Sequence, residues 1–158
     1  MKELYAATAT ADAFAAYGEI VNIYACDKPD EPICYFPDRM ILDMAGNQVI
    51  AGVCHVAPQA AVIAEVESHN ATDEGWILLN GGAVSAFALP CKDPNKAEFK
   101  AFSFPAGAYV RIRKGVWHFA PLPNGRTRLA VYCTLPPNTP ETDCTVVRLD
   151  EALEIHFC

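Results

Sequence analysis

The feature that most constrains the fold of this chain is a succession of short apolar or alternating runs, separated by turn signals roughly every eight to twelve residues. This spacing is typical of a sandwich or barrel, and no strand–helix–strand alternation indicates a parallel sheet. The 12 prolines also argue against long helices. We therefore predict an all-β fold with one or two short helices, arranged as an antiparallel β-barrel or jelly roll. The predicted strands are residues 19–25, 40–44, 49–56, 61–69, 74–80, 84–89, 98–104, 109–113, 116–120, 128–134 and 145–149.

One segment has the signature of a helix. In residues 10–17, Thr10 can cap the N-terminus, Phe14 and Tyr17 share a face, and Gly18 can end the helix. Residues 27–32 contain two prolines and three acidic residues and are predicted to form a loop. Residues 150–157 are compatible with either a helix or an edge strand.

Length and charge exclude several classes of protein. A chain of 158 residues is expected to form one domain, 1–158, with a core that needs no disulfides. The net charge of −7 argues against sequence-independent nucleic-acid binding, which needs an excess of Lys and Arg. Acidic residues interrupt the apolar N-terminus, so we predict neither a signal peptide nor a membrane span and expect a cytoplasmic protein.

The cysteines and the glycine motifs exclude further classes. Seven cysteines are an odd number without a CxxC pair, which favours reduced, buried thiols over a disulfide framework or a zinc ribbon. Ser85 and Cys133 lack the surroundings of a catalytic nucleophile. No phosphate-binding glycine motif is present, so we expect neither a nucleotide nor an organic cofactor.

Two predicted hairpins carry three candidate metal ligands. Residues 104–118 combine turn signals with two β-like runs that end at His118. The runs 61–69 and 74–80 flank a four-residue loop, which predicts that His69 and Glu74 share one face of a sheet. Two imidazoles and a carboxylate would leave open positions on a divalent metal for a substrate.

Each of these residues also has an ordinary structural interpretation. His69 could be a hydrogen-bonded histidine at a strand end, and Glu74 a solvated hairpin residue. His156, beside the C-terminus, is predicted to lie on the surface. The alternation around His55 makes it either a core histidine or a fourth pocket residue.

A row of polar and basic residues follows one face of the run 109–113. Tyr109 and Arg111 alternate with apolar residues, and Lys114 stands at the following turn. Such a row is most often solvated, but it could bind the carboxylate of a small anionic metabolite. Trp76 and Trp117 are predicted to be core or interface aromatics.

The spacing of these motifs resembles the two half-motifs of the cupin superfamily, because Glu74 precedes Gly81 by seven positions and His118 follows Gly115. The usual His-x-His pair of metal-binding cupins is absent after His69. The chain also resembles the ureidoglycolate lyase family, in residues 14–20, in the hairpin after His69, in Gly115-Val-Trp-His118 followed by Pro121-Leu122, and in a segment containing Asp143.

That resemblance implies a cupin-like barrel, usually a homodimer, which cleaves ureidoglycolate into glyoxylate and urea during allantoin breakdown. A metal on His69, Glu74 and His118 would bind the substrate, and Arg111 or Lys114 would hold its carboxylate. Without a metal, His118 would act as the base and Glu74 as the acid. The chain departs from the family pattern by carrying Glu74 in place of an amide and His55 in place of a basic residue.

Two other classes of function are compatible with the same residues. A different metal-dependent cupin, such as an isomerase or dioxygenase acting on a small acid, would use the same ligands. A non-catalytic member that binds a small metabolite would tolerate the loss of His69 and His118. A homodimer is also expected because an open barrel leaves edge strands that need covering.

Overall fold

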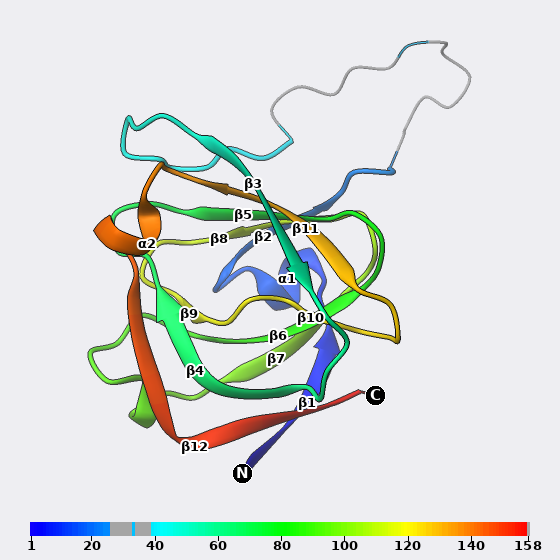
Figure 1. Ribbon diagram of the computed structural model, residues 1–158, viewed down its shortest axis with the longest axis vertical. Coiled ribbons are helices and arrows are strands. Elements are labelled where there is room, and N and C mark those ends of the chain that lie inside the picture. The colour runs from blue at the N-terminus through cyan, green and yellow to red at the C-terminus, as the bar shows by residue number, and fades with distance from the viewer. Residues whose placement is uncertain (26–32, 34–38, 158) are drawn as a thin grey trace.

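The computed structural model of the protein describes residues 1–25, 33 and 39–157, and the predicted loop 27–32 lies outside them. In the described part, two sheets face each other (Figure 1). The seven-stranded sheet has the order β10-β6-β7-β1-β12-β4-β9, and the five-stranded sheet has the order β2-β8-β5-β11-β3. The strands are β1 (Lys2–Thr8), β2 (Gly18–Asn22), β3 (Ile50–Val56), β4 (Val62–Ser68), β5 (Glu74–Leu78), β6 (Ala83–Ala88), β7 (Lys100–Phe104), β8 (Ala108–Ile112), β9 (Trp117–His118), β10 (Leu122–Pro123), β11 (Leu129–Leu135) and β12 (Thr145–Phe157).

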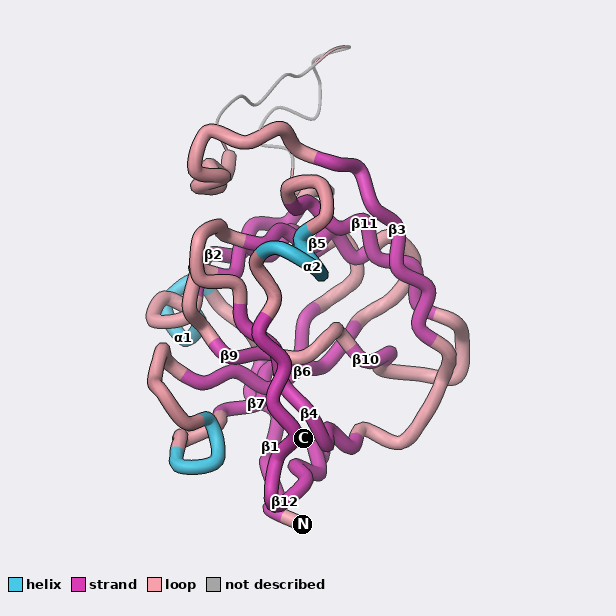
Figure 2. The backbone as a smooth tube through the Cα atoms, turned by 60° about the vertical axis from the view of Figure 1, so that its left-hand side comes forward, coloured by secondary structure: helices cyan, strands magenta, loops and turns pink. Residues whose placement is uncertain are grey.

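The seven-stranded sheet closes on itself because β6 pairs with β9 as well as with β7. Figures 1 and 2 show the five-stranded sheet lying across this ring. The structure therefore confirms the predicted all-β barrel, with only short helices in the described residues: α1 (Ala11–Phe14), α2 (Thr139–Thr142) and the 3-10 helix η1 (Pro94–Lys96). The predicted cap is also confirmed, since the Thr10 side chain accepts a hydrogen bond from the Ala13 amide.

Two clusters of apolar side chains stabilise the fold. The first lies between the sheets and includes Phe14, Trp76, Phe87 and Val110. The second is contributed by the strands of the closed sheet and includes Ile63, Val66 and Trp117. Every residue of β6 is buried, since its side chains alternate between the two clusters. The core positions predicted for Trp76 and Trp117 are thus confirmed.

Both predicted hairpins were wrong. β4 pairs with β12 and β9, whereas β5 pairs with β11 and β8, so residues 69–73 cross from one sheet to the other. Likewise β8 belongs to the five-stranded sheet and β9 to the closed sheet. Turn residues reverse the direction of the chain, but they do not decide which strand the following segment pairs with. In this protein, each of these strands pairs with strands that are distant in sequence.

Other differences have local causes. Residues 40–44 form no strand. Instead, Leu42 covers the outer face of the five-stranded sheet, where a side chain at Gly75 would come within 2.8 Å of it. β1 was not predicted because only Leu4 and Ala6 of its residues are buried, and it runs parallel to both neighbours. The ambiguous segment 150–157 continues β12 as a strand. Within the described residues, no helix is long and apolar enough to cross a membrane.

Candidate metal centre

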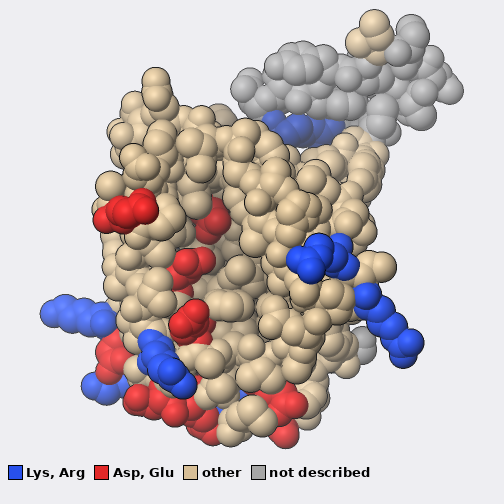
Figure 3. Space-filling model, in the orientation of Figure 1, with Lys and Arg blue, Asp and Glu red and all other residues tan. Residues whose placement is uncertain are grey.

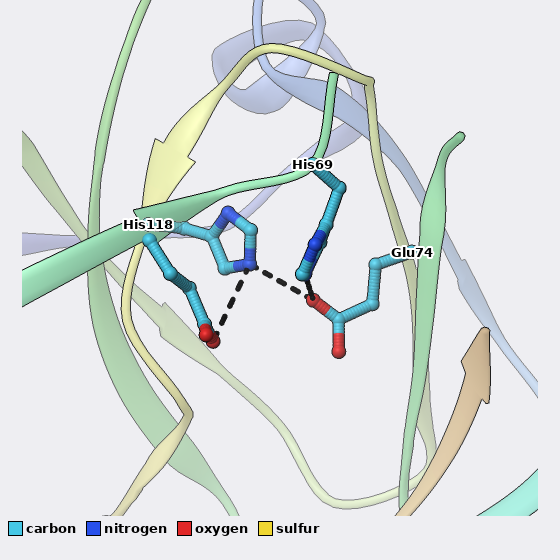
Figure 4. A group of neighbouring side chains, drawn as sticks. His69, Glu74 and His118 are labelled. Atoms are coloured by element: carbon cyan, nitrogen blue, oxygen red, sulfur yellow. Dashed lines mark hydrogen bonds and ion pairs between the residues drawn. The ribbon is translucent and has the colours of Figure 1, made fainter. Parts of the chain in front are cut away.

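Four side chains converge between the two sheets, as Figure 4 shows for the three that it labels. They are Glu67 in β4, His69 just after β4, Glu74 at the start of β5 and His118 at the end of β9. One ligand atom from each lies within 4.8 Å of those from the other three. His69, Glu74 and His118 are buried, with 4%, 6% and 1% of their surface exposed. The side chain of Glu67 is 31% exposed and is thus the most accessible member.

Strand register brings these residues together. Glu67 stands directly opposite His118 in the β4–β9 pair, while Val66 and Trp117 face the other way, into the cluster of the closed sheet. His69 is drawn to the same place because its carbonyl accepts the Gly115 amide at 2.6 Å. That turn requires glycine, since Gly115 has a φ of +79°. The crossing loop then places Glu74 against both imidazoles.

The orientation of both imidazoles suits metal binding. His69 Nδ1 lies 2.7 Å from the carbonyl oxygen of Asp143, and His118 Nδ1 lies 3.0 Å from that of Val116. Carbonyl oxygens only accept, so both Nδ1 atoms carry protons and both Nε2 atoms are directed into the cluster. Histidines that bind metals are commonly held by such a hydrogen bond from the other ring nitrogen.

Glu74 dominates the electrostatics of the cluster. Its Oε2 lies 2.8 Å from His118 Nε2 and 3.4 Å from His69 Nε2. Burial alone would raise the pKa of Glu74, but the hydrogen bonds from His118 and His69 lower it to about 2. Burial would likewise lower the pKa of His69, but the hydrogen bond and charge of Glu74 raise it to about 9. Around neutral pH, Glu74 is therefore ionised and the metal-free His69 is protonated.

The surroundings of the cluster are aromatic and thiol-rich. The ring centroid of Trp76 lies 5.7 Å from that of His118, and Phe87 stacks on His118 with centroids 6.4 Å apart. Burial raises the pKa of Cys133 and that of Cys144 to about 12, with the carboxylates of the cluster adding to the effect. These thiols therefore stay protonated. The four described cysteines are free thiols, but the predicted burial is not found, since Cys91 is exposed and the other three are partly buried. In the orientation of Figure 1, the surface of the molecule has a hollow with acidic atoms along it (Figure 3).

The structure brings together all three predicted ligands, although the predicted hairpins do not exist. It adds Glu67, which the sequence analysis missed. The available signal was the spacing Glu67-x-His69, because residues two apart on a strand share a face and so occupy the positions of a His-x-His pair. Glu67 Oε1 lies 3.9 Å from His118 Nε2.

The other predicted site residues lie elsewhere. Tyr109 and Arg111 are on the outer face of the five-stranded sheet, because Val110 and Ile112 fill the inner face. Arg111 forms ion pairs with two carboxylates, those of Asp73 at 2.8 Å and Glu19 at 2.7 Å, so its guanidinium group is already occupied.

Lys114 and the remaining histidines also lie outside the cluster. Lys114 Nζ pairs with Asp43 at 2.8 Å. His55 is exposed on β3, the edge strand of the five-stranded sheet, so it is not a core residue, and it is not part of the four-residue cluster; its inward-facing neighbours are Cys54 and Val56. His156 was predicted to lie on the surface but is partly buried, and its ring lies 5.3 Å from that of Tyr5.

A β-barrel that encloses two imidazoles and two carboxylates between its sheets has the architecture of a cupin-like protein with a candidate metal centre. No protein-family model matches the sequence, nor does any curated protein sequence. Solved structures do match the fold. A dTDP sugar isomerase from Desulfovibrio desulfuricans G20 is 16% identical with a TM-score of 0.54, and the match covers 84% of this chain and 83% of that one.

Two larger proteins show weaker similarity. A mutant of Bacillus subtilis oxalate decarboxylase is 16% identical with a TM-score of 0.45 over 66% of this chain. Tomato vicilin is 12% identical with a TM-score of 0.46 over 66% of this chain. This chain spans 25% and 27% of their lengths. At this level of identity, the similarity to the sugar isomerase establishes the fold alone.

Proposed function

We propose that this protein is a divalent-metal-dependent cupin enzyme that acts on a small, oxygen-rich metabolite. The observation that carries the proposal is the convergence of two imidazole Nε2 atoms and two carboxylates within 4.8 Å, with both Nδ1 atoms held by backbone carbonyls. A structural ion pair needs only one histidine and one carboxylate, whereas this donor set matches the needs of a metal ion.

The donor set fits an ion that accepts both nitrogen and oxygen ligands, such as Mn²⁺, Fe²⁺, Co²⁺ or Zn²⁺. His69, Glu74 and His118 would hold it from the buried side, and Glu67 from the more exposed side. When bound, the ion supplies Lewis acidity, which polarises substrate oxygens and lowers the pKa of an adjacent hydroxyl group.

The residues of the chain supply the remaining functions. Glu67 is the carboxylate at the accessible edge of the site and would face an entering substrate. Trp76 and Phe87 form an apolar wall that excludes water behind His118. Glu74 is ionised, which contradicts the acid role predicted for it in a metal-free mechanism. In the metal-free cluster, the ionised Glu74 is paired with a protonated His69 instead.

Cleavage of ureidoglycolate to glyoxylate and urea is a second, narrower candidate. It is supported by the sequence resemblance around Gly115-Val-Trp-His118, which includes one ligand of the cluster. Arg111 and Lys114 cannot hold the substrate carboxylate as expected, since both are paired with acidic residues away from the cluster. The test is the release of urea and glyoxylate by the purified protein, with Mn²⁺ and with a chelator. Product formation that the chelator abolishes would support this activity, and no product under either condition would exclude it.

Metal binding itself is tested by equilibrium dialysis against Mn²⁺ at pH 8. The wild-type protein should retain one ion per chain, and His118→Ala should lose it. His55→Ala is a matched control, because this imidazole is exposed and is not one of the four clustered side chains. Equal Mn²⁺ retention by the wild type and His118→Ala would refute the proposed site.

A further inference from the structure

We propose that Asp143 and Cys144, the two residues directly before β12, form a clip that positions the two metal ligands contributed by the β4 end. This inference rests on the proposed metal-dependent function. Neither residue belongs to the four-residue cluster, and each contacts a different member of it. Asp143 acts on His69, and Cys144 acts on Glu67.

Asp143 holds the crossing loop through its whole side chain. Its Oδ1 accepts hydrogen bonds from the backbone amides of Asn70 at 2.8 Å and Ala71 at 3.0 Å. Its Oδ2 accepts hydrogen bonds from the backbone amides of Ala71 at 3.0 Å and Thr72 at 3.2 Å. The Thr72 hydroxyl donates to the same Oδ2 at 3.4 Å. A charged carboxylate that accepts several backbone amides is a strong local restraint.

The backbone of Asp143 completes this arrangement. Its carbonyl accepts the Nδ1 proton of His69 at 2.7 Å. The side chain therefore fixes the loop that follows His69, while the main chain of the same residue fixes the ring of His69. Loss of the carboxylate would release three backbone amides and let His69 rotate away from the cluster.

Cys144 acts on the other ligand of this strand. Its thiol donates to Glu67 Oε2 at 3.4 Å, which leaves Oε1 as the oxygen on the side of His118. Glu67 is the most exposed ligand and so has the greatest freedom to adopt other rotamers. A weak donor at this point restricts that freedom without adding a charge to the site.

The clip is itself anchored by α2. The Asp143 amide donates to the Thr139 carbonyl, and the Thr139 hydroxyl, which is fully buried, donates to the Pro136 carbonyl. Figure 2 shows α2 at the end of the barrel where β12 begins. The clip thus couples the two β4-end ligands to a hydrogen-bonded turn.

Co²⁺ titration followed by visible absorption tests the clip, because the absorption bands report the ligands and geometry around the ion as well as the affinity. Asp143→Ala should weaken Co²⁺ binding by about 10- to 100-fold, the range typical of residues that orient metal ligands, and should alter the bands. Asp143→Asn retains one acceptor and should lose less. Cys144→Ala should shift the bands, and Cys144→Ser, which restores a donor, should return them towards those of the wild type.

Asp93→Ala is the matched control, since Asp93 caps η1 by accepting the Asn95 amide, far in sequence from the cluster. It should lower the melting temperature without changing the Co²⁺ spectrum or affinity. If Asp143→Ala does not fold, Asp143→Asn and Cys144→Ala carry the test. Wild-type affinity and spectra in those variants would overturn the clip while leaving the metal site intact. A wild-type protein that binds no Co²⁺ would overturn the proposed function and the clip together.

Discussion

The metal-free protein should become less stable as the pH rises from about 5.5 to about 8, because of the pair that His69 forms with Glu74. The pKa of His69 is about 9 in the folded chain against an ordinary value of 6.5, so the folded state binds this proton more tightly than the unfolded state. The resulting stabilisation is complete below about pH 6.5 and is lost as the pH passes through about 9. For these two pKa values, linkage gives a loss of about 2 kcal/mol in unfolding free energy between pH 5.5 and pH 8.

The assay is denaturant unfolding in the presence of EDTA at a series of pH values, on the wild type and on Glu74→Gln. The neutral amide no longer raises the pKa of His69, whereas burial still lowers it, so the stability of this variant should stay level or increase over the same range. Stopping near pH 8 keeps the thiols of the unfolded chain mostly protonated. The difference between the two profiles reports the interactions of the Glu74 carboxylate with the two imidazoles, and parallel profiles would refute this account of the cluster.

Three further outcomes follow from the same contacts. Metal affinity should rise by about tenfold per pH unit below pH 9, because the ion displaces the proton of His69; a pH-independent isotherm would argue against His69 as a ligand. Mn²⁺ at a hundred times its dissociation constant should raise the unfolding free energy by about 2.7 kcal/mol, reversibly with EDTA, and an unchanged melting curve would contradict binding to the folded state. Asp73→Ala should cost about 3 kcal/mol of stability, because the buried Asp73 carboxylate accepts hydrogen bonds from the Asp43 and Lys114 amides as well as from Arg111, which would keep only Glu19. Lys114→Ala removes an exposed ion pair and should leave the unfolding midpoint and Mn²⁺ binding unchanged. Comparable losses of stability in the two variants would contradict this difference between the buried and the exposed ion pair.

The all-β class could be predicted from the sequence because the strand and turn signals are local. The pairing of strands could not be predicted, because it depends on contacts far apart in sequence. β4 and β5 were expected to form a hairpin, yet each is paired in a different sheet, with β12 and β11 among their partners. The candidate ligands still meet, since a chain that crosses between two facing sheets brings its flanking residues as close together as a hairpin would.

The sequence identified only those members of the candidate site whose residue type is itself a strong signal of function. His118, His69 and Glu74 stood out because histidines are scarce in this chain and polar residues between apolar runs need partners. Glu67 was overlooked because a glutamate in an alternating strand is usually solvated. Arg111 was misplaced because alternation separates the two faces of a strand but does not say which face is inside. Here Val110 and Ile112 fill the core, so Arg111 faces outward to Asp73 and Glu19.

The most direct test of the metal centre is a crystal of the protein grown with Mn²⁺ and measured for anomalous scattering. The account predicts a single strong anomalous peak within about 2.3 Å of the Nε2 atoms of both His69 and His118, with carboxylate oxygens of Glu74 and Glu67 completing the protein ligands. A peak elsewhere, or none while Glu74 keeps its hydrogen bonds to both imidazoles, would contradict it.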